Sequence, residues 1–263
     1  LWLLVFSLFI PIGCERDLPD DGPVPDRMVT VNFTVGSLLK SAASDEENEI
    51  IGNIILFSVV GGDVVQKFIL SPEGGSLSIP GTVTMLYAIA NPSDALTTAL
   101  DTELPVPVTT LLDPLTADFP PAPASPFLMS GKANVVDNSV NITLARCVAK
   151  IQLTSTNPDF LIESVTVSAA SKGYVFDNSP SVPALTPVNH TYAGSDTVVF
   201  YVAEHSSANP PTFTVSGRFQ GQPAHLLWVK EQITLKDDGG VNNIEIKRNT
   251  CYQVDIDFFD EPL

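Results

Sequence analysis

The sequence predicts an all-β protein made of two β-sandwich domains in tandem. Short apolar runs alternate with polar residues at the two-residue period of half-buried strands over most of the chain. Between these runs stand most of the 22 prolines and 16 glycines, as in folds with many short strands and tight turns. A third observation divides the chain: one long strand-like run, residues 129–153, changes the face that carries its apolar side chains.

That change of face lies at Ala145–Arg146. Before it, Val140, Ile142 and Leu144 alternate with polar residues. After it, the apolar set is Cys147, Ala149, Ile151 and Leu153, and the outward set is Arg146, Lys150 and Gln152. A slip of one residue turns every side chain to the other face, so one straight strand cannot serve a single core through this point. We therefore predict a joint here, with domains at 28–145 and 146–263.

The first domain begins with the clearest strand of the chain, Val29–Val35, followed by a polar loop at 37–48. The run from Ile50 to Val60 is almost continuously apolar, which predicts a strand buried on both faces. Gly61 and Gly62 then predict a hairpin turn into a strand at 64–70.

Two further strands are predicted at 76–79 and 83–90. Ser93–Leu100 has the pattern of a short helix, with Ser93 as the N-cap and Asp94 in the first turn. The proline-rich stretch 104–126 predicts an extended loop.

In the second domain, residues 177–193 read as a long connection rich in turns, and Asp237–Gly240 reads as a hairpin turn. The predicted strands are 164–169, 198–202, 213–219, 224–235 and 251–259.

The first 13 residues, LWLLVFSLFIPIG, are apolar and uncharged. They are too short to span a bilayer and resemble the apolar part of a signal peptide, so we expect the sequence to begin inside one. Cys14 follows Ile12 and Gly13, which resembles the lipobox of bacterial lipoproteins, where this cysteine is acylated. The alternative is a signal peptide with an incidental cysteine. Residues 14–27 are acidic and predict a flexible tether.

The net charge of −17 argues against nucleic acid as a partner, because phosphates require a basic surface. It also argues against docking of the folded body on anionic lipid. His190, His205 and His225 have no metal-ligand spacing, and the sequence contains no hydrolase or phosphate-loop motif. We therefore predict no enzyme activity, no cofactor and no metal site.

Cys147 and Cys251 leave two alternatives open, a disulfide or two reduced thiols. Export favours a disulfide. Cys147 shares the apolar face of its strand, however, whereas Cys251 shares the polar face with Gln253 and Asp255.

Several segments together resemble the type V pilins (fimbrillins) of Bacteroidales, in the same order along the chain. Cys14 lies where that family is lipidated, and VTVNFTV at 29–35 resembles its first strand. The other matching segments are MLYAIAN at 85–91, PFLMSG at 126–131, LARCVAKIQL at 144–153 and RNTCYQVDIDF at 248–258.

The resemblance implies two transthyretin-like Greek-key sandwiches and a lipid-anchored precursor at the outer membrane, held through Cys14. A trypsin-like protease would cut the loop after the first strand, and that strand would leave. A donor strand from another pilin subunit would then fill the groove, by β-augmentation, to build an adhesive fimbrium at the cell surface.

The position that matches the cut is Lys40, before Ser41, where the family usually has Arg. The displaced strand carries Val29, Val31, Phe33 and Val35. Full burial of all four side chains would contribute about 6–12 kcal/mol, before entropy costs.

Three alternatives remain open at this point. Asp260–Leu263 is all that follows the last predicted strand, which would suit a subunit that accepts a donor strand without giving one, at a tip or accessory position. An uncut Lys40 with a lipid on Cys14 would suit a membrane anchor of the pilus. From another class, the chain could be a surface lipoprotein that binds glycan or another ligand without polymerising. Glycan-binding platforms usually offer several exposed aromatic residues, and Trp228 is the one tryptophan outside the signal. This scarcity disfavours a glycan platform.

Overall fold

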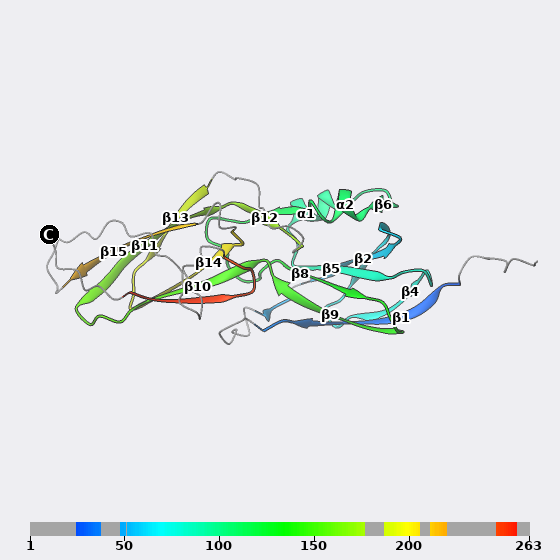
Figure 1. Cartoon of the computed structure of the whole chain (residues 1–263), viewed down its shortest axis with the longest axis horizontal. Helices are drawn as coiled ribbons and strands as arrows, with labels where there is room; N and C mark the ends of the chain where they lie inside the picture. The colour runs from blue at the N-terminus through cyan, green and yellow to red at the C-terminus, as the bar shows by residue number, and fades with distance from the viewer. Residues whose placement is uncertain are drawn as a thin grey trace, which may run out of the picture.

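The computed structural model confirms the predicted all-β class and describes residues 25–37, 48–50, 52–176, 187–205, 211–219 and 246–256. The molecule is elongated, with one large sheet toward one end and two smaller sheets toward the other (Figure 1). We call these the N-terminal and the C-terminal region.

The N-terminal region is built on one eight-stranded sheet in the order β4-β1-β9-β8-β5-β2-β3-β6. Strands β8 and β9 pair only at Met129–Arg146 and Ser130–Ala145, so the sheet folds on itself at this corner. One apolar cluster takes side chains from β1, β4 and β9 on one arm and from β2, β5 and β8 on the other. The strands are β1 (Arg27–Val35), β2 (Ile54–Val60), β3 (Asp63–Leu70), β4 (Gly75–Ile79), β5 (Met85–Ala90), β6 (Val106–Pro107), β8 (Met129–Asn134) and β9 (Ser139–Arg146).

Local sequence explains the hairpin and the first helix. Gly61 and Gly62, with φ of 59° and 97°, form the two-residue turn between β2 and β3. Helix α1 (Asp94–Ala99) begins as predicted, because the hydroxyl of Ser93 accepts a hydrogen bond from the Leu96 amide.

The stretch 104–126 is more ordered than the predicted loop. It contains β6, helix α2 (Val108–Leu111) and β7 (Thr116–Asp118). Pro107 stands directly before α2, a position at which proline costs no helical hydrogen bond. The prolines here start elements as well as interrupt them, which the sequence prediction missed.

The C-terminal region is a sandwich of two three-stranded sheets, β14-β10-β16 and β13-β11-β15, around a second apolar cluster. Its strands are β10 (Val148–Ser155), β11 (Phe160–Ala170), β12 (Lys172–Tyr174), β13 (Pro187–Ala193), β14 (Thr197–Ala203), β15 (Thr212–Phe219) and β16 (Cys251–Ile256). Strand β13 lies inside the predicted connection 177–193, so that prediction is wrong in part: its side chains are exposed or only half-buried, which left no apolar pattern to detect. The predicted strand 224–235 and the turn 237–240 lie outside the described residues.

The two regions share a third apolar cluster. It covers the face of β2 and β5 beneath α1 and α2, and it also includes Cys147, Val148, Val175, Phe176 and Ala203 from the C-terminal side. Strand β7 pairs with β12 across the same place. Near the predicted change of face at Ala145–Arg146, β9 ends at Arg146 and β10 begins at Val148. The division into two Greek-key domains stays a prediction.

Candidate functional site

Strand β1 has two different neighbours along its length. Its first half, Arg27–Val31, pairs antiparallel with β4, and its second half, Thr30–Val35, pairs parallel with β9. Only Thr30 and Val31 are paired on both sides in the described sheet. β1 therefore lies in a slot between two strands that come from distant parts of the chain.

The apolar side chains of β1 face the folded core unequally. Val29 and Val31 are completely buried, whereas Phe33 and Val35 are only half-buried against the same cluster. At about 1.5–3 kcal/mol for each full burial, the two valines contribute about 3–6 kcal/mol. The estimate made from four fully buried side chains was therefore too high.

The outward side chains of β1 form a polar ladder. Thr30 and Ser76 are hydrogen-bonded at 3.2 Å, Asn32 donates to Asn141 at 3.1 Å, and Thr34 and Thr143 are joined at 3.4 Å. All three pairs are exposed to water, which competes for the same groups, so each contributes little net stability. Main-chain pairing and the two buried valines hold most of the strand.

Arg27 belongs to the strand and not to the tether that the sequence predicted for 14–27. It pairs with Ile79, and its Nη2 donates to the carbonyls of Val83 at 3.0 Å and Val135 at 3.3 Å. These bonds fix the beginning of β1 on the loops around it, while the buried Arg27 Nε has no hydrogen-bond partner among the described residues.

The other end of β1 is held by two side chains from outside it. The Gly36 amide donates to Leu144 O at 2.8 Å, and Arg146 Nη1 donates to Gly36 O at 3.0 Å. Asn249 Nδ2 donates to Ser37 O at 3.0 Å, and its Oδ1 accepts from Arg146 Nη1 at 2.7 Å.

Arg146 was predicted to face outward, but it is only 1% exposed. The prediction failed because a two-residue period assigns every polar residue to the solvent-facing side of a strand. The bonds that allow its burial come from segments far away in sequence, which periodicity does not report.

The chain is also anchored beyond the loop that follows β1. Asn48 Oδ1 accepts from Arg146 Nη2. Asn91, at φ 54°, donates from Nδ2 to Glu49 O at 2.9 Å and to Phe127 O at 2.8 Å. The main chain is thus fixed at 36–37 and again at 48–49. Lys40 and Ser41 lie between these anchors but outside the described residues, as does Cys14.

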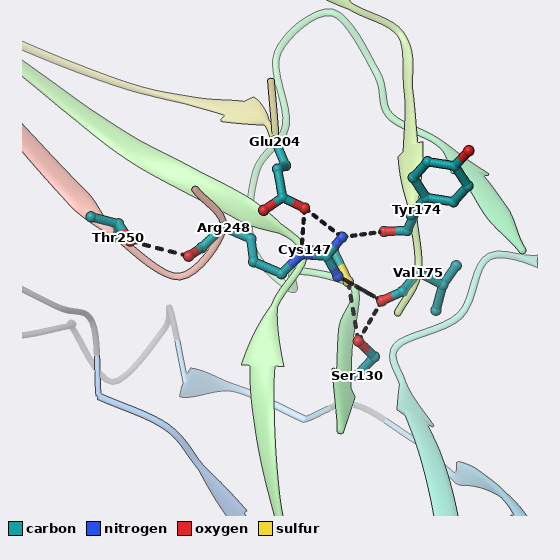
Figure 2. A network of polar contacts seen from close by, with 7 residues as sticks. All are labelled: Ser130, Cys147, Tyr174, Val175, Glu204, Arg248 and Thr250. Atoms are coloured by element: carbon teal, nitrogen blue, oxygen red, sulfur yellow. Dashed lines mark hydrogen bonds and ion pairs between the residues drawn. The ribbon is translucent and has the colours of Figure 1, made fainter. Parts of the chain in front are cut away.

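A second arginine cluster, centred on Arg248, lies in the C-terminal region, and Ser130 of β8 in the N-terminal region donates to one of its members, Val175 O (Figure 2). Arg248 Nε donates to Glu204 Oε2 at 2.9 Å, and its guanidinium also donates to Val175 O and Tyr174 O, both at 2.8 Å. The side chains of Arg248 and Glu204 are 7% and 20% exposed, so this ion pair is largely shielded from water. It pins the end of β12 to the turn that precedes β16.

Cys147 lies at the edge of this cluster, and its thiol donates to Val175 O at 3.4 Å. Burial raises the pKa of the thiol above its ordinary value, and the nearby Arg248 charge offsets only part of that rise. The thiol is therefore protonated and unreactive at neutral pH.

Cys147 and Cys251 are both reduced, so the disulfide considered from the sequence is not formed. Cys251 pairs with Lys150, three positions along β10 from Cys147. At about 3.3 Å per residue, that offset is roughly 10 Å, beyond the reach of about 7 Å between the Cα atoms of a disulfide.

Within the described part of the chain, no three His, Cys, Asp or Glu side chains gather where they could hold a metal ion. No helix in the same part is long and apolar enough to cross a membrane.

Comparison with known proteins gives a match in fold. No protein-family model matches the chain, and no curated protein matches its sequence. Among solved structures, the tip fimbrial protein Mfa3 from Porphyromonas gingivalis, with C-terminal truncation, superposes with a TM-score of 0.57 at 14% identity, over 90% of this chain and 97% of that one. A fimbrial assembly protein from Parabacteroides distasonis superposes with a TM-score of 0.56 at 16% identity, over 88% of this chain and 90% of that one. At these identities the likeness establishes the β-sandwich fold.

Proposed function

We propose that this protein is a structural subunit of a cell-surface fimbrium that supports adhesion and is assembled by strand exchange. The observation that carries the proposal is the position of β1, which is paired to β4 and β9 and covers a deep apolar cluster. It is joined to the rest of the fold through a segment that the structure anchors on both sides. The likeness in fold to two fimbrial proteins supports the same reading.

The proposed mechanism starts with a cut by a trypsin-like protease after Lys40. The anchors on Asn48 and Glu49 keep the downstream chain in place, so only β1 becomes a separate piece. When β1 leaves, the cluster around Ile142 and Leu77 is exposed to water and the edges of β4 and β9 lose their pairing. A donor strand from another pilin subunit restores both the apolar contacts and the main-chain hydrogen bonds.

Before the cut, the precursor would be anchored in the outer membrane through a lipid on Cys14. The cell surface is therefore the proposed site of assembly, and the proposed partners are other pilin subunits and the protease. A chain that is never cut would instead serve as the membrane anchor of the pilus.

The described surface gives no support to the glycan-binding alternative. Flat sugar faces stack on aromatic rings, and such sites usually expose several of them. The exposed large hydrophobic side chains of the described residues are all aliphatic or methionine: Met28, Ile69, Val136, Leu161 and Val199. We therefore favour the fimbrial subunit over a carbohydrate-binding lipoprotein.

Limited proteolysis tests the proposal. The protein without its first 14 residues is treated with Lys- and Arg-specific proteases, intact mass locates the cuts, and an unboiled SDS gel detects multimers. We expect one fast cut after Lys40, then SDS-resistant multimers or capture of an added donor-strand peptide. Lys40→Ala is the matched control and should stay uncut and monomeric. An intact fold that resists cutting at Lys40 would favour the anchor or the non-polymerising lipoprotein.

A further inference from the structure

We propose that Arg146 and Asn249 form a clamp that binds two main-chain carbonyls at the end of β1, and that this clamp holds the end of any strand lying beside β9. For a replacement strand, this inference rests on the proposed function. For β1 itself, it rests on the contacts at Gly36 and Ser37. Arg146 and Asn249 are positioning residues in this scheme.

The clamp binds backbone atoms and not a side chain. Its targets are the carbonyls of Gly36 and Ser37, the two residues that follow the last β1–β9 pair, Val35–Leu144. Every peptide supplies such carbonyls, so a foreign strand can occupy the same position. A strand that reached the slot without a carbonyl there would leave a donor of the buried Arg146 unsatisfied, which is costly.

The clamp remains in place when β1 is removed, because neither member belongs to that strand. Arg146 ends β9, and Asn249 lies in the turn before β16 with φ 53° and its amide bonded to Val148 O at 2.9 Å. The bond from Arg146 to Asn249 Oδ1 fixes which way the side-chain amide points, so Nδ2 faces the position of Ser37 O.

Register matters here because one side of a strand in the slot faces the solvent and the other side faces the apolar core. A shift of a single residue would turn the side chains at the positions of Val29 and Val31 out of the core. Sheet pairing alone does not choose between registers, since main-chain ladders repeat at every second residue. The clamp takes carbonyls from a strand in any register, so it holds the end of the strand, while burial at the positions of Val29 and Val31 selects the face.

The clamp also favours a small residue. A Cβ on Gly36 would lie 3.3 Å from Thr143 Cγ2, 3.4 Å from Leu144 O and 3.5 Å from Asn249 Nδ2. Only the contact with Thr143 is tighter than usual, and the other two are ordinary van der Waals distances. A replacement strand with glycine directly after its last paired residue therefore fits without any shift, and alanine there requires only a small movement of Thr143.

The test uses two synthetic strands on the nicked protein. A specific protease site is inserted between Lys40 and Ser41, and cutting there separates β1 from the rest of the chain. Labelled peptides are then added to take the place of β1. The long peptide covers 27–37 and the short peptide covers 27–35, both with C-terminal amides. The terminal amide of the short peptide can keep the bond that Gly36 N makes to Leu144 O, so of the hydrogen bonds described at residues 36 and 37 it lacks only those to the two clamped carbonyls.

On the parent protein, we expect the short peptide to dissociate at least tenfold faster than the long one. On the Arg146→Lys, Asn249→Gly double variant, we expect the two rates to agree, because the clamp is gone. Asn249→Gly alone is the mildest variant, since glycine accepts the positive φ of that turn. Asn141→Ala is the control: it removes the bond to Asn32 in mid-strand and should speed both peptides alike.

The same tenfold ratio on the double variant would overturn the clamp, because the two carbonyls would then act without Arg146 and Asn249. Hydrogen exchange on uncut protein separates this result from failure of the proposed function. The Gly36 amide should exchange at least tenfold faster in Asn249→Gly than in the parent, and an unchanged rate contradicts the clamp. If β1 never leaves the nicked chain, strand exchange fails, and the Gly36 rate alone decides on the clamp.

Discussion

Among the described strands, each region has one that runs parallel to its neighbour, and these two strands are held in different ways. β1 lies parallel to β9 and β16 lies parallel to β10, so both partners are consecutive along the chain. β1 stands between two strands and buries Val29 and Val31 completely. β16 stands at the edge of its described sheet, and its inward residues Tyr252 and Val254 are only half-buried, although Ile256 on the same face is buried.

The attachments at their ends differ as well. The turn before β16 carries the shielded Arg248–Glu204 ion pair and is tied to two carbonyls of the β12 end. The end of β1 is held by hydrogen bonds from Arg146 and Asn249 to its backbone. The difference is that the end of β1 is held through its backbone by side chains from outside the strand, whereas the turn before β16 is held through the side chain of Arg248.

The largest expected effect tests the buried slot. Val31→Asp places a carboxylate at a fully buried site and should destabilise the protein by at least about 4 kcal/mol. Val254→Asp, at the half-buried place in β16, should cost about 1–2 kcal/mol. Urea unfolding with a check on the m-value measures both. Equal losses would remove the contrast between the slot and the edge.

The next effect tests how β16 is fastened. Arg248→Met leaves Glu204 and two carbonyls without their donor and should cost about 3 kcal/mol. Arg218→Met is the matched control, since its pair with Glu163 is half-exposed at 51% and 41% and should be worth about 0–1 kcal/mol. Thermal and urea unfolding of the two variants would be compared, and similar losses would mean that the Arg248 cluster does not lock the junction.

A smaller effect tests the close approach of Gly74 to the backbone of β1. Gly74 has φ 83°, and a Cβ there would lie 2.0 Å from Val31 O. Gly74→Ala should therefore cost about 2–3 kcal/mol and speed amide exchange in β1, because the strand must move aside. Gly61→Ala, at φ 59° with no atom within 4 Å of the added Cβ, should cost only about 1 kcal/mol for its backbone strain. Equal costs would show that the approach to Val31 is not tight.

The smallest effect concerns two ionisable groups, the buried Cys147 between β9 and β10 and the half-buried Tyr192 in β13. Burial raises the pKa of Cys147 and of Tyr192, so both groups keep their protons in the folded state at pH values where the unfolded chain begins to lose them. The stability that they contribute is complete below the unfolded pKa, about 8.5 for cysteine, and is lost as the pH rises through the folded value.

We therefore expect the urea midpoint to fall between pH 7 and pH 9.5, and to fall less in Cys147→Ala than in the parent. The slope for one group is at most about 1.4 kcal/mol per pH unit. An identical fall in both proteins would exclude the thiol as its source.

Most of the N-terminal strands were predictable because their signals are local. The alternation of Val29–Val35, the Gly61–Gly62 turn and the Ser93 cap each lie within a few residues of the element that they determine. The elements missed were β13, which is exposed or half-buried throughout, the short strand β12, and the short pieces between 104 and 126. All of them exist through pairing or packing with residues far away in the sequence.

The candidate site divides in the same manner. The sequence by itself determined the all-β class, the apolar face of β1 and the change of face near Arg146, because period-2 patterning records burial one strand at a time. Only the tertiary structure decided that β1 lies between β4 and β9, that Arg146 is buried against Gly36 and Asn249, and that Cys147 and Cys251 are too far apart to bond. These are relations between residues more than 40 positions apart, and no local pattern encodes the distance between them.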